Sequence, residues 1–578
     1  MPRAETLLTP EDLDVEHRAI ARTIDEFWAR EVEPNLDALR RHEPGVGRAL
    51  LVRAAALGLT GLQVPERFGG LGLDLRSVIV AVEHLATDAS YLGWHLGHIG
   101  IGTLPLVYFG TEDQQQRYLP RLASLELLAA YALTEPHAGS DALAARTRAD
   151  LSADGRHYVL NGQKAWITNG GEADLFTVFA KVGGEAFTAF LVERSFGVTS
   201  GPEEHKMGIT GTSTTPLYFD NVRVPAENVL GEIGRGHEIA LNVLNVGRLE
   251  IGPLAVRGAR QILDTSIEYA RSRRAFGHSI AEYGAIQRKV ADCAIGIFMT
   301  ESAMWRVVGL IEDYVASEGG RAEQGAAAPP TDAAWLGAAA PAMRKELSAF
   351  REFAAECAMI KVFGSEMLDE VADEGVQIHG GYGYHRDYFV ERAYRDARIN
   401  RIFEGTNEIN RLAIPTLLLK RAARSGLPLL QMGAARFDNT LEPAAPATDE
   451  ADIVANAKTV ALMLLTAAHR RHGDAVREHQ EVLMDIADTI IETFVLESGV
   501  LRSRKLALTG GAGVTGDMCA VYAREVASHV AHAAHQVLPA VMDGAELARA
   551  LAVVRGLTAC TPVDVFAARR RVATALLS

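Results

Sequence analysis

The stretch Arg401-Ile402-Phe403-Glu404-Gly405-Thr406-Asn407-Glu408-Ile409 is the most informative part of this chain. It places the carboxylate of Glu404 between a bulky apolar residue and a glycine. A carboxylate beside apolar groups loses hydration, so its pKa rises toward working pH and it can act as a general base. The same residues also suit an ordinary helix start, with Thr406 and Asn407 as candidate caps. The stretch by itself leaves both interpretations open.

Size and charge exclude several classes of protein. The chain has 578 residues, too many for one core, and roughly four domain-sized units fit. Its formal net charge of -15 repels phosphate backbones, so we expect no nucleic-acid binding. Residues 1–41 resemble neither a signal peptide nor a transit peptide, and we expect no membrane span. No metal site is predicted, and the scattered cysteines are expected to be free thiols of a reducing compartment: Cys293, Cys357, Cys519 and Cys560.

Hydrophobic periodicity divides the chain into helical and β regions. Residues 1–125 read as an α-helical domain with a helix start at Thr9-Pro10-Glu11-Asp12. Residues 126–236 predict a β domain with strand and hairpin signals at Asn161-Gly162, Asn169-Gly170 and Gly183-Gly184. Residues 237–424 are helical again, with a flexible insertion at about 318–341. Residues 425–450 read as a linker, and 451–578 as more helices with a break at 510–513. The fold class is therefore α+β and mainly α.

Two motifs of the β region have a functional and a structural interpretation. The segment 134–141 reads Thr-Glu-Pro-His-Ala-Gly-Ser-Asp, which could cradle an anion or a flat heterocycle, or could form an ordinary turn. Trp166 and Thr168 share one face of a strand, because side chains alternate along a strand. The tryptophan could stack on a ring, or could belong to the core of the β domain.

Two further motifs lie in the helical region. Arg271, Arg273 and Arg274 end a helix, where they could bind phosphate or interact with the helix dipole. The segment 377–383 reads Gln-Ile-His-Gly-Gly-Tyr-Gly, in which Gly380 suits a helix C-cap and the lone His379 is expected to be structural. A Rossmann fingerprint and a Walker loop are both missing from the sequence, so no nicotinamide or ATP site of those types is predicted.

Together these segments resemble the acyl-CoA dehydrogenase family over about residues 10–424. The resemblance rests on motifs that occur in the family's order: Leu133-Thr134-Glu135-Pro136, Gly139-Ser140-Asp141, Asn161-Gly162-Gln163-Lys164, Trp166-Ile167-Thr168-Asn169-Gly170, Arg273 to Gly277, Gln377 to Gly383, Arg395-Asp396, and Phe403 to Glu408. It implies an N-terminal helical domain, a middle β-barrel and a C-terminal four-helix bundle. The tail after residue 425 is similar to the extra helical region of the very-long-chain branch.

The resemblance also implies the site. FAD should bind at a subunit interface of a homodimer or a dimer of dimers. Its contacts should be Leu133, Thr134, Gly139, Ser140, Trp166, Thr168, Arg273, Phe276, Gln377, Gly380, Gly381, Thr406 and Glu408. The acyl-CoA contacts should be Ser140, Asn245, Arg248 and Gly405. Ala275 and the Tyr283-Gly284 pair depart from the family pattern, which weakens the expected pyrophosphate contacts.

The activity implied by the resemblance is FAD-dependent α,β-dehydrogenation of a fatty acyl-CoA to the trans-2-enoyl-CoA, in fatty-acid β-oxidation. Glu404 is the expected base, and its backbone N–H should help to polarise the thioester carbonyl. Some relatives place the base on an earlier helix, where this chain has Gly247; nearby Glu250 is therefore the second candidate. Electron-transferring flavoprotein is the implied acceptor. An acyl-CoA oxidase and a non-catalytic scaffold or assembly protein are the alternatives.

Substrate length and location rest on two weaker features. Gly97, Gly100 and Gly102 could leave room for a long acyl chain or could allow close helix packing. With the C-terminal tail they favour long-chain substrates. The basic segment 420–424, followed by leucines, could contact an anionic membrane or form a solvated linker. We expect a cytoplasmic protein, with weak peripheral membrane contact as the further possibility.

Overall fold

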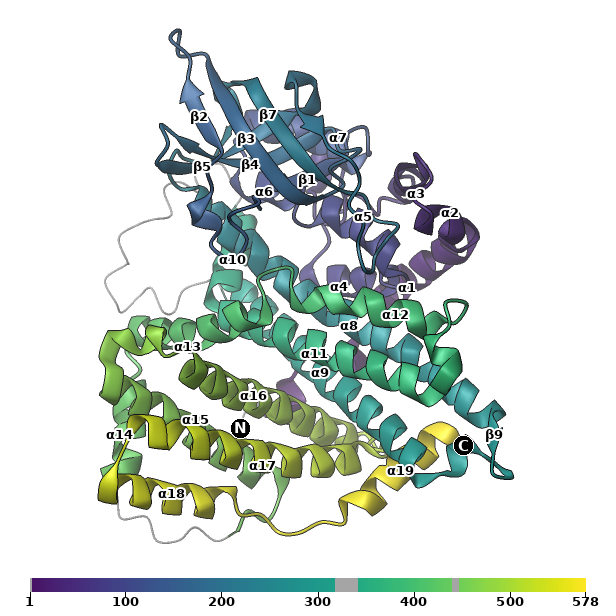
Figure 1. The fold of residues 1–578 in the computed structure, drawn as a ribbon, viewed down its shortest axis with the longest axis vertical. Coiled ribbons are helices and arrows are strands. Elements are labelled where there is room, and N and C mark those ends of the chain that lie inside the picture. The colour runs from purple at the N-terminus through teal and green to yellow at the C-terminus, as the bar shows by residue number, and fades with distance from the viewer. Residues whose placement is uncertain (1–2, 318–340, 439–445) are drawn as a thin grey trace. The chain divides into compact units, whose positions relative to one another are not determined.

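The structure is a computed structural model that describes residues 3–317, 341–438 and 446–578 (Figure 1). The chain forms two compact units. The β-containing unit comprises Leu13–Arg257 and Ile311–Arg351, and the helical unit comprises Met1–Asp12, Gly258–Leu310 and Glu352–Ser578. Apart from Pro341, the insertion predicted at 318–341 lies outside the described residues.

Short helices form the N-terminal part of the β-containing unit. They are α1 (Val15–Phe27), α2 (Leu36–Arg40), α3 (Val46–Ala55), α4 (Leu75–Leu85), α5 (Ala89–Ile99), α6 (Leu104–Phe109) and α7 (Glu112–Ala123). The helix start predicted at Thr9 is confirmed only as a short 3-10 helix. Pro10–Asp12 forms only a short 3-10 turn, and α1 begins after Asp14, whose carboxylate accepts the backbone N–H groups of Glu16 and His17.

The predicted β domain forms one eight-stranded sheet. Its strands are β1 (Ala129–Ala132), β2 (Arg148–Leu151), β3 (His157–Thr168), β4 (Leu175–Val182), β5 (Ala186–Glu193), β6 (Thr199–Ser200), β7 (Thr214–Pro225) and β8 (Val229–Leu230). They pair in the order β6-β7-β3-β2-β4-β5-β8, and β1 pairs with β4 in parallel. Gly183-Gly184 joins β4 to β5 with φ angles of +60° and +83°, so the hairpin predicted there is confirmed.

Asn161-Gly162 is not the end of a strand. Strand β3 continues through it, and the register with β7 shifts between Leu160 and Gly162. The side chain of Asn161 accepts the N–H of Asn221 at 2.9 Å, and a Cβ atom on Gly162 would lie 2.6 Å from the hydroxyl of Thr147. The neighbouring strands therefore convert a turn signal into a β-bulge.

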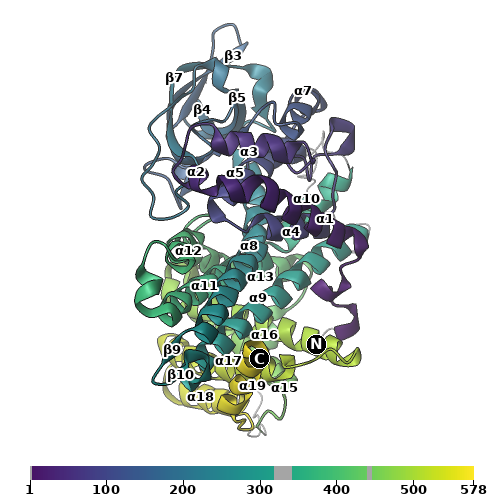
Figure 2. The ribbon, with the colours of Figure 1, turned by 90° about the vertical axis from the view of Figure 1, so that its right-hand side faces the viewer.

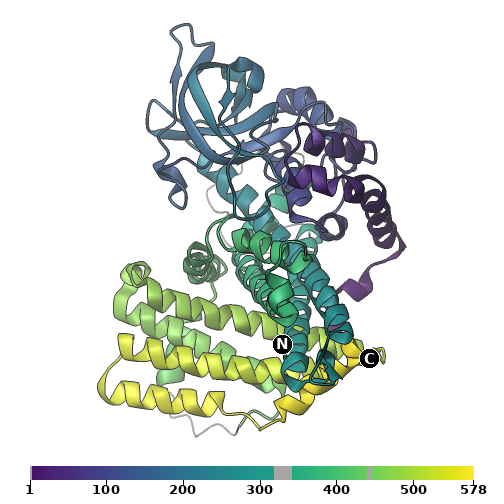
Figure 3. The same ribbon diagram turned by 45° about the vertical axis from the view of Figure 1, so that its right-hand side comes forward.

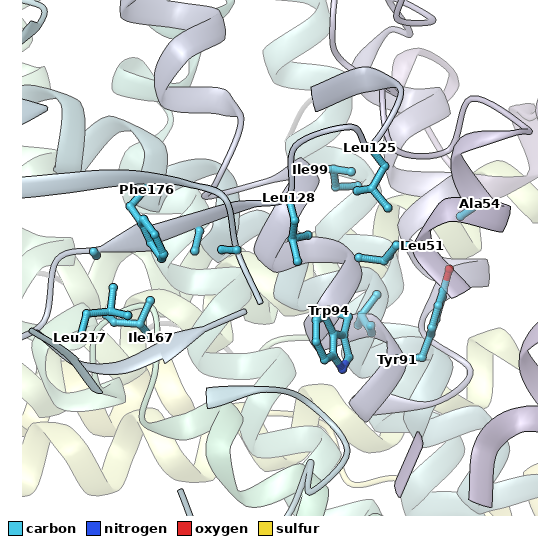
Figure 4. Close-up of a cluster of buried hydrophobic side chains, with 14 of the residues drawn as sticks. Leu51, Ala54, Tyr91, Trp94, Ile99, Leu125, Leu128, Ile167, Phe176 and Leu217 are labelled. Carbon is cyan, nitrogen blue, oxygen red and sulfur yellow. The ribbon is translucent and has the colours of Figure 1, made fainter. Parts of the chain in front are cut away.

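One apolar core joins the helices and the sheet of the β-containing unit (Figure 4). Leu51, Tyr91 and Trp94 come from α3 and α5, whereas Ile167 and Phe176 come from β3 and β4. Burying such a side chain contributes about 1.5–3 kcal/mol. The indole N–H of Trp94 donates to the carbonyl of Gly211 at 2.8 Å, so the one polar atom of this ring is satisfied.

Long helices form most of the remaining chain (Figure 2). They are α8 (Gly236–Ser272), α9 (Gly284–Ala316), α10 (Pro341–Glu352), α11 (Ala354–His379), α12 (Phe389–Ala397) and α13 (Asn407–Arg424). A small hairpin of β9 (Arg274–Ala275) and β10 (His278–Ser279) follows α8. Helix α11 packs against α12 and α13 within the helical unit.

The C-terminal extension of the helical unit is helical, as predicted (Figure 3). It contains α15 (Glu450–His472), α16 (Gln480–Leu508), α17 (Thr515–Val541), α18 (Gly544–Thr558) and α19 (Val565–Leu577). The break predicted at 510–513 separates α16 from α17. The linker predicted at 425–450 is wrong in part, because Leu429–Asp438 forms helix α14, which packs against α15.

Two expectations from composition have different outcomes. All four cysteines are free thiols, as predicted. The expectation that no segment could span a membrane is wrong by length and composition, since three helices qualify among the residues that the structure describes: Gly236–Ser272, Gly284–Ala316 and Glu450–Glu478. Their most apolar windows are 83%, 83% and 61% buried inside the protein, so packing within the fold accounts for much of their apolar character.

A buried ionic cluster ties the extension to the rest of the helical unit. Arg502 on α16 donates to Glu301 on α9 at 2.7 Å and to Glu11 near the N-terminus at 2.6 Å. Glu301 also accepts from Arg260 at 2.5 Å. Burial disfavours the ionised form of Glu301, but the two arginines outweigh burial and lower the pKa of this carboxyl.

We predict that Glu301→Gln lowers the free energy of unfolding by about 3 kcal/mol, because Arg502 and Arg260 lose charged hydrogen bonds to Glu301 and the buried Arg502 keeps only the carboxylate of Glu11. The lowered pKa of Glu301 in the folded state means that its contribution is present above the unfolded-state pKa and is lost as pH falls through the folded-state pKa. As pH falls below the ordinary glutamate pKa of 4.5, the parent should therefore lose more stability than the variant, which has no carboxyl group at position 301. Urea unfolding followed by circular dichroism at several pH values measures both effects.

The matched control is Arg504→Gln on the same helix, which removes a half-exposed ion pair with Asp449. It should change the free energy of unfolding by no more than about 1 kcal/mol. Equal losses of unfolding free energy in the two variants would show that the buried cluster stabilises the protein no more than an exposed ion pair does.

Candidate active site

The segment that carries Glu404 lies between α12 and α13 of the helical unit and has an unusual backbone. Glu404 has φ +57° and Gly405 has φ +80°, so two consecutive residues adopt the left-handed region. For a residue with a side chain this conformation costs of the order of 1–3 kcal/mol and is found preferentially at functional sites. The hydroxyl of Thr406 accepts the N–H of Ile409 at 3.3 Å, so Thr406 is the N-cap of α13, as predicted. The helix-cap interpretation and the general-base interpretation of this segment can therefore both hold, because the cap is Thr406 and the candidate base is Glu404.

Asn410 holds this base loop, which we define as residues 404–406. Its side-chain nitrogen lies 2.8 Å from the carbonyl oxygen of Gly405, 3.0 Å from that of Thr406 and 3.4 Å from that of Glu404. Asn410 is completely buried. The motif analysis missed this residue, although an asparagine on the same helical face as Asn407 is a polar signal in an otherwise apolar position.

The first turn of α13 is fixed in turn by charged groups of α11. Asn407 accepts from the ammonium group of Lys361 at 2.6 Å and donates to Glu366 at 2.9 Å. Arg411 donates to both oxygens of Glu366 at 2.7 Å. These residues were also missed, because their roles depend on the packing of α13 against α11.

Within the β-containing unit, a buried ion pair fixes Leu133 and Thr134 to β3. The ammonium group of Lys164 lies 2.7 Å from the carboxylate of Glu135 and 3.1 Å from the carbonyl oxygen of Leu133. The N–H of Ala165 donates to the carbonyl of Thr134 at 2.9 Å. Burial lowers the pKa of Lys164 to about 8, whereas the same lysine outweighs burial at Glu135 and lowers the pKa of that carboxyl.

Trp166 and Thr168 lie on the strand that this pair secures. A second register shift, between Lys164 and Ile167, gives Trp166 a φ of +61° and leaves it 60% exposed. Its interpretation as a core residue is therefore wrong, and the exposed ring is available for stacking. Ile167, between the two, is buried in the apolar core.

Gly139 and Ser140 lie on an exposed turn of the same unit. The backbone groups of Glu135 and Ala138 bond to each other at 3.2 and 3.1 Å, so the interpretation as a turn is confirmed. A Cβ atom on Gly139 would meet no other atom within 4 Å. The turn interpretation does not exclude ligand binding, since Gly139 leaves the backbone accessible.

Asn245 and Arg248, the predicted acyl-CoA contacts, are neighbours on α8 and both are buried. The guanidinium of Arg248 donates to the side-chain oxygen of Asn245 at 3.0 Å. The structure therefore brings these two predicted residues together.

The three glycines proposed to leave room for substrate are in tight contact instead. A Cβ atom on Gly97 would lie 2.7 Å from the methyl group of Thr168, and one on Gly102 would lie 2.5 Å from the carbonyl oxygen of Gly97. On Gly100 it would lie 3.2 Å from the carboxylate of Glu250. Close packing is thus the interpretation that the structure supports, and the argument for a long acyl chain from these glycines is wrong.

The remaining predicted residues lie in the helical unit, at the ends of α8 and α11. Arg273 lies 5.7 Å from the ring centre of Tyr382, which follows Gly380 and Gly381 in a short 3-10 turn. Gly380 ends α11 with φ +60°, as the C-cap prediction required. Gln377 lies in the last turn of α11, and Glu408 is exposed in the first turn of α13. Phe276, with φ +51°, is 94% exposed between β9 and β10.

Several charged or aromatic motif residues have structural partners. Arg271 donates to the carbonyl oxygen of Leu576 at 2.9 Å, and Arg274 donates to that of Gly277 at 2.7 Å. Of the three clustered arginines, Arg273 is therefore the best phosphate candidate. His379 is buried, with Nδ1 2.7 Å from the carbonyl oxygen of Gly375, in keeping with its predicted structural role.

The basic segment 420–424 is partly neutralised. Arg421 donates to Glu356 at 2.6 Å, and Arg424 donates to Glu352 at 2.8 Å. Paired cations attract an anionic membrane less strongly than free ones do, and membrane contact of this segment stays a prediction.

Comparison with known proteins gives one consistent result along the chain. Family models match for the acyl-CoA dehydrogenase N-terminal domain at residues 14–126 and the middle domain at 130–222. Two different models of an acyl-CoA dehydrogenase C-terminal domain match residues 234–328 with 332–418, and residues 456–556.

Individual relatives agree with the family models. A probable acyl-CoA dehydrogenase of Bacillus subtilis is 42% identical over 99% of this chain and 95% of its own. The human mitochondrial very long-chain specific acyl-CoA dehydrogenase is 41% identical over 62% of this chain and 51% of its own, so the match spans about half of that relative. The solved structure of an acyl-CoA dehydrogenase complexed with FAD from Bacillus anthracis has a TM-score of 0.93 and 41% identity, and covers 100% of this chain and 97% of its own.

We predict that Lys164→Met destabilises the β-containing unit by about 3–5 kcal/mol, because it leaves the buried carboxylate of Glu135 without its cation. The loop at 133–134 should loosen as well, which hydrogen exchange in a peptide covering it would detect. Lys181→Met is the control, since Lys181 is a half-buried lysine of β4 in the same sheet. A loss of less than about 1 kcal/mol in Lys164→Met would contradict a scaffolding role for the pair.

Proposed function

The chain belongs to the acyl-CoA dehydrogenase family, and on that premise we propose that it binds FAD and oxidises the Cα–Cβ bond of a long-chain fatty acyl-CoA to the trans-2-enoyl-CoA in β-oxidation. Electron-transferring flavoprotein is the proposed electron acceptor. The observation that carries the proposal is the base loop, which presents a carboxylate from a left-handed backbone, a conformation that ordinary helix capping does not require.

The residues present fit a flavin nucleotide. Trp166 and Phe276 are aromatic side chains exposed far more than packing alone would leave them, and each can stack on a planar group. Arg273 can pair with a phosphate, and Gly380 and Gly381 leave open backbone, since a Cβ atom on either would meet nothing within 4 Å. When bound, the flavin supplies the acceptor for the hydride that leaves the β carbon.

Glu404 is the proposed base that takes the α proton. This proton is only weakly acidic, so the carboxylate must be basic and must be positioned before the substrate arrives. Substrate binding expels water, which raises the pKa of a carboxyl group and strengthens hydrogen bonds within the site. The backbone N–H of Glu404 is the proposed donor to the thioester carbonyl, where negative charge develops.

The proposal of a long-chain substrate rests on relatives rather than on Gly97, Gly100 and Gly102. Two very long-chain specific relatives are 41–42% identical to this chain over 369 residues, and a second C-terminal domain model matches the extension. The proposed acyl-CoA contacts remain Ser140, Asn245, Arg248 and Gly405. Of these, the paired Asn245 and Arg248 provide a rigid polar element on α8.

We predict that Glu404→Gln keeps the flavin but lowers the rate of substrate-dependent flavin bleaching by at least about 100-fold, because the amide has nearly the same shape and no basicity. Anaerobic stopped-flow absorbance with palmitoyl-CoA measures the rate, and the visible spectrum measures flavin content. Glu250→Gln is the comparison variant. If Glu250→Gln loses bleaching and Glu404→Gln keeps it, the base is Glu250.

We predict that kcat/KM rises from butyryl- through octanoyl- to palmitoyl-CoA. Each methylene buried in an apolar pocket contributes about 0.8 kcal/mol, or about fourfold, until the pocket is filled. An optimum at butyryl-CoA would reject the long-chain assignment.

The rate at which the substrate-reduced flavin is reoxidised tests the electron acceptor. We expect slow reoxidation by air and fast reoxidation by electron-transferring flavoprotein, whereas fast reoxidation by air would indicate an acyl-CoA oxidase.

A further inference from the structure

We propose that Asn410 is the positioning residue for Glu404, and that the C-terminal extension contributes to this positioning through Asp488 and Arg411. The proposal rests on the proposed function, because it assigns how the base is held. It gives the extension a role in the chemistry in addition to its role in packing.

The first step is the contact between Asn410 and the base loop. Three successive carbonyl oxygens, from Glu404 to Thr406, converge on one side-chain nitrogen at 2.8–3.4 Å. The backbone N–H groups of α13 do not reach the carbonyls of Glu404 and Gly405, because these carbonyls precede the N-cap of the helix. A buried amide nitrogen satisfies them, and an aspartate carboxylate would repel them.

The second step links α13 to the extension. Arg411, one residue after Asn410, uses two nitrogens on Glu366 of α11 and its Nε on Asp488 of α16 at 2.6 Å. Arg411 is mostly buried, and burial alone would lower its pKa, but the two carboxylates raise it. Burial raises the pKa of Asp488 to about 6, against the opposing effect of Arg411. The guanidinium plane is thus fixed from two helices.

The third step is the reason why the backbone of Glu404 needs contacts that hold it in place. A glutamate at φ +57° relaxes toward ordinary backbone conformations unless its surroundings hold it. A displacement of about 1 Å in a catalytic group can cost roughly 100-fold in rate. The hydrogen bonds of Asn410 oppose relaxation directly, and the Arg411 contacts fix the helix from which Asn410 acts.

The test compares Asn410→Ala, Asn410→Asp and Asp488→Asn with the control Glu525→Gln. Glu525 is also on the extension, and its side chain is 40% exposed against 41% for Asp488. It pairs with the buried Arg569, which keeps a second carboxylate, Asp292, when Glu525 is replaced. The control therefore removes one of two carboxylates from a buried arginine, as Asp488→Asn does, at a place away from the base loop.

Amide hydrogen exchange in a peptide covering 401–412 measures the loop without using activity. Exchange should be at least about 10-fold faster in both Asn410 variants and unchanged in Glu525→Gln. For bleaching by palmitoyl-CoA, kcat should fall roughly 10- to 100-fold in the Asn410 variants with KM nearly constant. Asp488→Asn should lower kcat by up to about fivefold, because Arg411 keeps Glu366. A merely structural role would reduce flavin content and leave kcat per bound flavin unchanged.

Each outcome decides one question. Unchanged exchange in the Asn410 variants overturns the proposal, and so does unchanged kcat in a protein whose parent bleaches. If Asp488→Asn and Glu525→Gln behave alike, the extension has no part in positioning. If the loop loosens as expected but the parent protein bleaches with no acyl-CoA, the anchoring of the loop holds and the proposed function fails.

Discussion

The left-handed backbone at Glu404 and Gly405 is the constraint on which the candidate active site depends. A side chain in this region is sterically disfavoured, and the carbonyls of Glu404 and Gly405 precede the N-cap of α13, so they accept no backbone hydrogen bond from that helix. The loop therefore needs support from outside its own hydrogen-bond pattern. Asn410 provides that support. The need for such support explains why buried amides and charges occur where α13 packs on α11, although burying apolar residues there would cost less free energy.

In the β-containing unit, buried charged groups likewise hold a loop in one geometry. Lys164 and Glu135 are both buried, and Lys164 donates to the carboxylate of Glu135 and to the backbone carbonyl of Leu133 in the loop that carries Leu133 and Thr134. An apolar contact would hold the loop near the strand but would not fix its orientation, since apolar packing is weakly directional. Charged hydrogen bonds are directional, so they suit places where a loop must keep one geometry.

The sequence predicted correctly those structural features that depend on a few adjacent residues. Thr406 as a cap, Gly380 as a C-cap and Gly183-Gly184 as a hairpin all depend on a few adjacent residues, and all three are confirmed. Asn161-Gly162 was mistaken for a turn because β7 and Thr147 decide its conformation. The role of Asn410 escaped prediction for a different reason: its partners are only four to six residues earlier in the chain, but the direction of their carbonyls depends on the left-handed backbone at Glu404 and Gly405.

The ionic cluster around Arg502 has a consequence for the order in which the chain folds. Glu11 and Arg502 are 491 residues apart, and Lys505 reaches Asp12 beside them. Ribosomes add about 5–20 residues per second, so roughly 25–100 seconds separate the synthesis of the two partners. During that interval the contacts of Glu11 and Asp12 with α16 cannot form, so the docking of this segment onto the extension becomes one of the last steps of assembly. Closing so long a loop carries a large entropic cost, which the cluster of charges must offset in a single cooperative event.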